Sequence, residues 1–267
     1  MARSCKQSFP FRFGTTSYII PADIMPNVEF LRDRVDDIEL VLFESDEYSN
    51  LPPDADILSL SSVAAGSGLT FSVHLPLDVY FGNESREERR CSVGKCLRII
   101  ELCRPLPKSA YVMHFESGPG VDINRFGSAE KLRFVDNIRE SVSELLEKSG
   151  ECADQFCAEN LNYPFELVWP AVEELGLSVT LDVGHLEFYG FPVESHLERY
   201  FHRTRVLHMH GTKEGRDHNS LFHMQPDTLG MVMRYLLENP LEQRVFTMEI
   251  FSEDDFFSSC GVMERWL

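Results

Sequence analysis

The chain has 267 residues and a mass of 30.7 kDa, which fits a single domain with a sizeable core. Its formal net charge of −18 argues against duplex DNA as a partner, because affinity for a phosphate backbone comes from clustered lysine and arginine. The seven cysteines are scattered and odd in number, unlike a secreted disulfide framework, so we expect a cytoplasmic protein. The opening segment lacks the apolar stretch of a signal peptide, and no apolar run approaches the roughly 18 residues that cross a membrane, so we expect no membrane partner.

Apolar, β-rich runs alternate with amphipathic stretches over the whole length, as in repeated βα units around a parallel sheet. Eight runs predict strands, at residues 11–18, 38–44, 69–75, 110–115, 155–161, 177–183, 205–211 and 245–251. Helical patterns fill the intervals; in the longest, Ser128 stands at an N-cap position and Gly150 at the C-terminal end. No internal repeat or linker interrupts the pattern. We therefore predict one domain over residues 1–267, an α/β fold of the (β/α)8 TIM barrel class.

Side chains that bind metals stand at the ends of six successive predicted strands. They are His74 in FSVHL, His114 in YVMHF, Glu159 in FCAENL, Asp182 in VTLDVGH, His208 in VLHMH and Glu249 in FTMEIF. Burying an unpaired charge at the end of an apolar strand costs free energy that packing does not return. Parallel strands of a closed barrel bring their C-terminal ends to one rim. The sequence therefore predicts a metal site at the C-terminal face of the strands.

Imidazole and carboxylate are the usual ligands of zinc and of related divalent ions, and a carboxylate can bridge two of them. We therefore expect divalent metal cofactors, with zinc first and manganese or another divalent ion as alternatives. His185, three residues after Asp182, and His218, in the loop HMHGTKEGRDH, are the next candidate ligands. His210 in the same loop has three open roles: a metal ligand, a support behind a ligand, or a proton donor to substrate.

Other polar residues follow the predicted strands and are candidates for substrate contact. We expect Glu44, Thr16, Tyr18, Asp217 and Arg216 to bind substrate, with contacts to neighbouring loops as the alternative for Glu44 and a structural role as the alternative for the hydroxyls. Glu159, Glu249 and His210 are the predicted catalytic residues. His196, His202 and His223 fall on helical or distal positions, and we assign them no role in the site.

The order of the predicted ligands resembles that of the xylose-isomerase-like TIM barrels, which include the endonuclease IV type of apurinic endonuclease and the sugar isomerases and epimerases. In the endonuclease IV group the third to eighth strands carry His, His, Glu, Asp, His and Glu, as here, and LDVGH matches the family's Asp-x-x-His element. The resemblance implies that Glu159 bridges two ions, one held with His74 and His114, the other with Asp182, His208 and Glu249. A third ion would use His185 and His218, but Arg216 replaces the first residue of the family's Asp-x-His. It implies two or three ions.

A narrower resemblance concerns the segments FRFGTTSYIIPADIMPNVEFL, DDIELVLFE and HMHGTKEGRDH, which are similar to those of the cobamide-remodelling phosphodiesterases. It implies removal of the lower-ligand nucleotide part of a corrinoid, giving a cobinamide-type product. Loops at 76–84, 115–127 and 186–192 would then leave a wide mouth. Its apolar faces would come from Phe81, Phe115, Phe188, Tyr189 and Phe191, unless these aromatic residues only seat the loops on the barrel.

The prediction is a metal-dependent phosphodiester hydrolase acting on a small molecule, with a corrinoid as the candidate substrate. The first alternative is a sugar or sugar-phosphate isomerase or epimerase, which needs one divalent ion on Glu159, Asp182, His208 and Glu249. The additional imidazoles His74, His114 and His218 favour hydrolysis. The second alternative is a non-catalytic metal- or corrinoid-binding protein. The sequence leaves the oligomeric state open.

Overall fold

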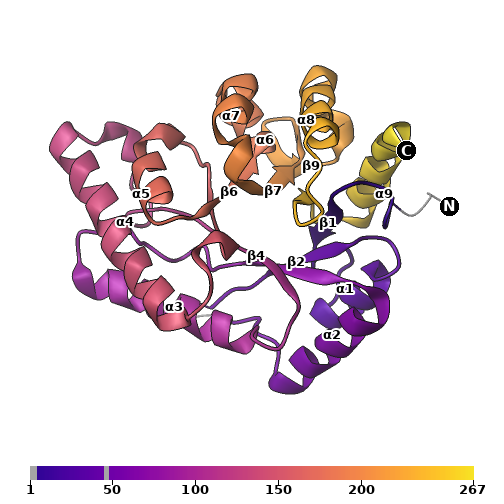
Figure 1. The fold of residues 1–267 in the computed structure, drawn as a ribbon, viewed down its shortest axis with the longest axis horizontal. Helices are drawn as coiled ribbons and strands as arrows, with labels where there is room; N and C mark the ends of the chain where they lie inside the picture. Colours follow the sequence, from indigo (N-terminus) through magenta and orange to yellow (C-terminus); the bar gives the residue numbers. More distant parts are fainter. Residues whose placement is uncertain (1–4, 45–47) are drawn as a thin grey trace.

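A closed barrel of parallel strands forms the centre of the computed structural model, which describes residues 5–44 and 48–267 (Figure 1). The strands in order around the barrel are β1 (Arg12–Thr16), β10 (Val245–Met248), β7 (Thr204–Met209), β6 (Ser178–Asp182), β5 (Phe156–Glu159), β4 (Lys108–Met113), β3 (Thr70–His74) and β2 (Asp37–Val41). Each overlaps one of the eight predicted runs, and every neighbouring pair is parallel. The predicted (β/α)8 barrel class is confirmed.

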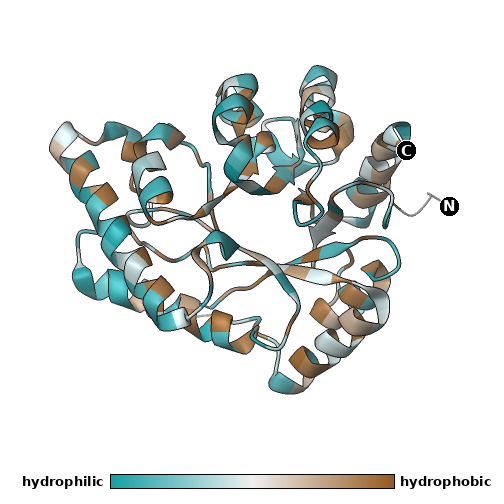
Figure 2. Ribbon diagram, viewed as in Figure 1, coloured by the Kyte–Doolittle hydropathy of each residue, from teal (hydrophilic) through white to brown (hydrophobic). Residues whose placement is uncertain are grey.

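Helices surround the barrel, as Figure 1 shows. Their bounds are α1 (Ile24–Leu31), α2 (Asp54–Ser67), α3 (Arg86–Leu102), α4 (Ser128–Ser149), α5 (Trp169–Glu174), α6 (Val183–Tyr189), α7 (Val193–Tyr200), α8 (Pro226–Glu238) and α9 (Glu253–Met263). Figure 2 shows hydrophilic and hydrophobic residues mixed along most of them, as expected of helices that cover a core on one side only. No described helix is both long and apolar enough to span a membrane. All seven cysteines are free, as expected.

The wall of the barrel separates two buried apolar layers, because successive side chains of a strand point to opposite faces. A small inner cluster consists of Ala110, Val112, Cys157, Val206 and Val245. The large outer cluster joins strand residues such as Phe71, Tyr111 and Phe156 to residues of the helices. His114 and Glu159 continue the inner alternation, at two-residue spacing after Val112 and Cys157. Small inner residues therefore fill the barrel below the predicted site.

Two local predictions about helices need correction. Residues 186–192 were expected to form a loop, but α6 begins directly after β6. The Asp182 carboxylate caps this helix by accepting the His185 backbone N–H at 2.7 Å, and Gly190, in the left-handed region, ends it. The α4 N-cap is Gly127 instead of Ser128, since the Glu130 side chain accepts the Gly127 N–H at 2.6 Å.

The loop after β7 also contains regular structure. β8 (Gly211–Lys213) and β9 (Arg216–Asn219) form an antiparallel hairpin that lies outside the barrel sheet. This hairpin carries His218, Asp217 and Arg216.

Phe246 lies between Phe11 and Phe13, with ring centroids 5.8 and 5.7 Å away, and is fully buried. Phe246→Ala should lower the free energy of unfolding by about 3–5 kcal/mol, because it removes buried area and leaves a cavity. Urea denaturation measures this. Leu58→Ala on α2, where the side chain is 61% exposed, is the control and should change stability by less than about 0.5 kcal/mol. Equal losses for the two variants would contradict the proposed packing.

Candidate metal centre

Three groups of histidine and carboxylate side chains meet where the barrel strands end. They are His74, His114 and Glu159; Glu159, Asp182, His208 and Glu249; and His185, His210 and His218. Within each group, one nitrogen or carboxylate oxygen from every residue lies within 4.8 Å of the others. The structure thus brings together all eight residues predicted as metal ligands, and adds His210 to the third group.

Glu159 stands between the first two groups. Its Oε2 lies 3.0 Å from His114 Nε2 and 3.6 Å from His74 Nε2. Its Oε1 lies 3.4 Å from His208 Nδ1 and 3.6 Å from His185 Nδ1. Because the two oxygens face different groups, this carboxylate has the geometry of a bridge between two cations.

Four buried atoms of the second group make no hydrogen bond in the described part of the chain. They are Glu159 Oε1, Asp182 Oδ2, His208 Nδ1 and Glu249 Oε2. They face one another or His185 only as ion pairs, at 3.2 Å between His208 Nδ1 and Glu249 Oε2 and 2.8 Å between His185 Nδ1 and Asp182 Oδ2. A buried polar atom without a hydrogen bond costs about 1–3 kcal/mol, which a cation bound among these atoms would offset. Three carboxylate oxygens and one imidazole nitrogen are a donor set that zinc and manganese accept. The residues present therefore fit a divalent cation.

Hydrogen bonds fix which nitrogen of two histidines carries the proton. His74 Nδ1 lies 2.8 Å from the Leu75 carbonyl oxygen, which only accepts, so the proton is on Nδ1 and the lone pair of Nε2 faces the first group. His208 Nε2 lies 2.9 Å from Glu39 Oε2, so Nδ1 is the nitrogen that faces the second group and would give its lone pair to an ion once the ring is neutral. Carboxylates of this kind behind a metal-binding imidazole set its orientation and basicity.

Glu39 was missed by the sequence analysis. It lies on β2, is fully buried, and contacts the ring of His208 across the barrel. An available signal was the acidic residue at the second position of the apolar run IELVLFE, where only a paired charge is tolerated. Glu44, at the end of the same run, was predicted instead.

Protons on the imidazoles balance the carboxylates of the metal-free centre. Burial alone would raise the pKa of Glu159, but His208 and His114 outweigh it and hold that pKa well below its usual range. Burial alone would lower the pKa of His185, yet the neighbouring Asp182 carboxylate raises it to about 10. The pKa of His218 rises to about 9 for the same kind of reason, with Glu249 as the principal partner.

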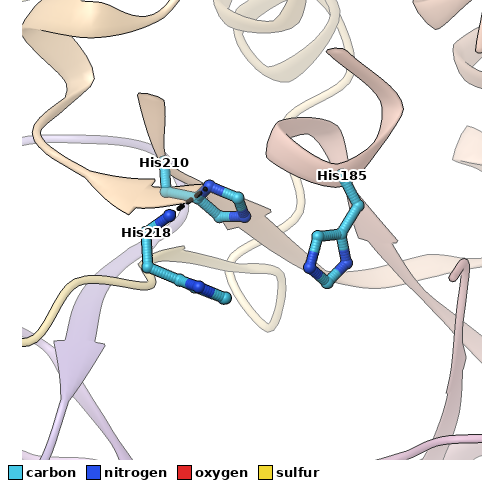
Figure 3. A group of neighbouring side chains, drawn as sticks. All are labelled: His185, His210 and His218. Atoms are coloured by element: carbon cyan, nitrogen blue, oxygen red, sulfur yellow. Dashed lines mark hydrogen bonds between the residues drawn. The ribbon is translucent and has the colours of Figure 1, made fainter. Parts of the chain in front are cut away.

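In the third group His185 lies on α6, His210 between β7 and β8, and His218 on β9, and Figure 3 shows the three imidazoles around a shared space. The rings of His210 and His218 stack with centroids 4.4 Å apart, and the ring of His185 lies 5.4 Å from that of His210. Asp217 Oδ1 is 3.1 Å from His218 Nδ1, and Asp217 Oδ2 is 3.8 Å from His185 Nε2. Arg216, exposed on the same hairpin, lies outside the group.

The residues predicted to contact substrate make different contacts within the protein. Thr16 is fully buried and its hydroxyl donates to the Ile250 carbonyl at 2.5 Å, which is a structural role, the alternative left open for the hydroxyls. The Tyr18 hydroxyl accepts a hydrogen bond from Asn50 at 2.6 Å. Glu44 pairs with Arg98 of the helix α3, whereas the alternative left open for it was contact with a neighbouring loop.

Among the predicted aromatic faces, Phe81 and Phe115 are fully buried with rings 6.2 Å apart, so they seat the loops and do not line a mouth. Tyr189 is 43% exposed, and its ring lies 5.6 Å from that of His185. Phe188 and Phe191 are partly exposed and line a cavity of about 750 Å³ that includes none of the site histidines His185, His210 and His218. These three remain candidates for substrate contact.

The fold and the ligand-bearing rim define a (β/α)8 protein able to hold divalent cations. The sequence profile of the xylose isomerase-like TIM barrel family matches residues 35–264, and the chain belongs to this family. No curated protein matches the chain in sequence.

Several solved structures are similar in fold. A D-tagatose 3-epimerase-like protein is 20% identical over 96% of this chain and 97% of its own, with a TM-score of 0.74. Endonuclease IV from Thermus thermophilus is 19% identical over 96% and 98%, with a TM-score of 0.70. An IOLI protein with a zinc atom is 15% identical over 96% of each chain, with a TM-score of 0.68. At such identities the likeness establishes the fold alone.

Glu39→Gln should weaken zinc binding about 10–100-fold, because the neutral amide no longer supports His208 as a carboxylate does. Competition with a chromophoric chelator measures the affinity. Glu29→Gln on α1, where the side chain is 46% exposed, removes a carboxylate outside the site and should leave the affinity unchanged. Wild-type affinity in Glu39→Gln would show that Glu39 does not support a ligand.

The metal-free protein should lose stability as pH rises from about 6.5 towards 10. His185 and His218 have folded-state pKa values of about 10 and about 9, above the unfolded value of 6.5. Their contribution is therefore complete below pH 6.5 and is lost as pH passes through the folded values. Urea titrations with chelator at pH 6.5, 8 and 9.5 test this. Constant or rising stability over this range would contradict the protonated centre.

Proposed function

We propose that this protein is a metal-dependent hydrolase that cleaves a phosphodiester in a small-molecule substrate. The observation that carries the proposal is that the two oxygens of Glu159 face two separate ligand groups at one barrel mouth. Paired divalent ions about 3.5–4 Å apart are suited to in-line displacement at phosphorus. We propose two ions in the first two groups and a third with His185 and His218, zinc being the first candidate.

The bound ions would lower the pKa of a water molecule towards about 7 and polarise a phosphoryl oxygen. The chain's own contribution is the placement of charge. Glu159 and Glu249 are held deprotonated by the neighbouring imidazoles, so both are ready as ligands. The β8–β9 hairpin brings His218 to 3.3 Å from Glu249 and carries the exposed Arg216. The positive charge of Arg216 would attract an anionic substrate to the site.

A cobamide is the proposed substrate. Support comes from the resemblance of three segments to cobamide-remodelling phosphodiesterases, and from Tyr189, whose partly exposed ring lies 5.6 Å from that of His185. Water would add across one phosphorus–oxygen bond, separating the nucleotide part from a cobinamide-type product. The net charge of −18 opposes a duplex-DNA substrate.

Zinc-loaded protein incubated with an adenosylated cobamide should release a nucleotide-free corrinoid, identified by chromatography and mass spectrometry. Glu159→Gln should reduce turnover by more than the roughly 10–100-fold typical of partners behind metal ligands, because a shared ligand is lost. The exposed Glu147→Gln on α4 is the matched control, and circular dichroism checks the fold of both. Failure to turn over any of several cobamides, alongside activity on another substrate, would remove the assignment.

A sugar epimerase is the second candidate, and one observation favours it: Glu159, Asp182, His208 and Glu249 form a complete one-ion group without the remaining histidines. An epimerase has little need for His74 and His114, which is why hydrolysis ranks first. Incorporation of solvent deuterium into a ketose, without phosphoester cleavage, would reverse this order.

A further inference from the structure

His210 makes two polar contacts that together determine its protonation. Its Nδ1 accepts a hydrogen bond from the backbone N–H of His218 at 3.0 Å, drawn as the dashed line in Figure 3. A backbone N–H only donates, so Nδ1 carries no proton. A neutral imidazole has one N–H, which must then be on Nε2, and a nitrogen that bears a proton has no lone pair for a cation.

The protonated nitrogen faces a carboxylate of the second group. His210 Nε2 lies 3.2 Å from Asp182 Oδ1, the same oxygen that accepts the backbone N–H of His185 at 2.7 Å. The other oxygen, Asp182 Oδ2, is buried and lies 2.8 Å from His185 Nδ1. His210 Nε2 and the His185 backbone N–H therefore both face Oδ1, while Oδ2 faces the ring of His185.

The ring of His210 has no room to turn away from these contacts. It is fully buried, and a Cβ on Gly184 would lie 2.3 Å from its Cε1, so only glycine at this place in α6 admits the imidazole. His218 has a φ of 56°, a left-handed conformation that costs a non-glycine residue about 1–2 kcal/mol. The hydrogen bond to His210 holds the backbone of His218 in that conformation.

We propose that His210 is a positioning residue, protonated on Nε2, that orients Asp182 and His218, and that it is not a ligand of the third ion. The inference rests on the proposed metal centre. Of the three roles that the sequence left open for His210, this proposal chooses support behind a ligand. Among the described residues, only the imidazoles of His185 and His218 then remain available to a third ion.

Long-range proton–nitrogen NMR of protein labelled with ¹⁵N-histidine tests the tautomer directly, in metal-free and zinc-loaded samples. His210, assigned by the peaks that disappear in His210→Asn and in His210→Gln, should be protonated on Nε2 in both samples. His196 is an internal reference of the opposite tautomer, because its Nδ1 lies 2.8 Å from the Pro192 carbonyl oxygen. An unprotonated, zinc-shifted Nε2 in His210 would overturn the proposal. The metal-free spectrum decides the tautomer even if the proposed hydrolase activity fails.

Metal binding by two variants provides the second test, since glutamine places an amide N–H near the position of Nε2 and asparagine places a carbonyl near Nδ1. His210→Gln should keep zinc affinity within a few-fold, whereas His210→Asn should weaken it about 10–100-fold. Both should bind the wild-type number of ions at saturation, as should the exposed control His202→Asn. Loss of one ion per chain in both His210 variants would identify His210 as a ligand and sink the proposal.

Discussion

Charge balance among buried carboxylates is the constraint on which the mouth of the barrel depends. Glu39, Glu159, Asp182 and Glu249 are all nearly inaccessible to water, where removing one partner of an ion pair costs about 3–5 kcal/mol. Histidines approach every one of them, at 2.9 Å for Glu39, 3.0 Å for Glu159, 2.8 Å for Asp182 and 3.2 Å for Glu249. These contacts raise the pKa of His208 and of His185, so in the metal-free chain the protons of these two imidazoles balance carboxylate charge. Metal binding is therefore an exchange of protons for cations.

The barrel supplies the geometry for that exchange. Small inner side chains such as Ala110 and Val206 lie below the ligands, and the two-residue repeat of the strands carries His114 and His208 to the rim. Asn160 joins the ends of β5 and β6, since its side chain accepts the Asp182 N–H at 2.8 Å and donates to the Asp182 carbonyl at 2.9 Å. The ligand positions thus follow from regular strand geometry with side-chain braces between strands.

Features that repeat along a strand could be predicted from the sequence, and features made by contacts between distant segments could not. Each of the eight strand runs was found, and the six candidate ligands at strand ends came together, because alternation and parallel pairing are encoded locally. Glu39 meets His208 across the barrel, 169 positions away in the chain, so its role is visible only once the barrel is closed. From the sequence Thr16 is expected to place its hydroxyl at the rim, but in the fold the Ile250 carbonyl oxygen lies beside it and accepts its hydrogen bond.

The distribution of the ligands also implies an order of assembly during synthesis on the ribosome. His74, His114 and Glu159 belong to three consecutive βα units whose strands pair directly, so their group is complete once β3, β4 and β5 have emerged and paired. The second group also needs Glu249, just after β10, the strand that closes the barrel against β1. A cation bound early by the first group would therefore be alone until the last strand is in place. Only then could Glu159 bind a second cation in the second group through its other oxygen.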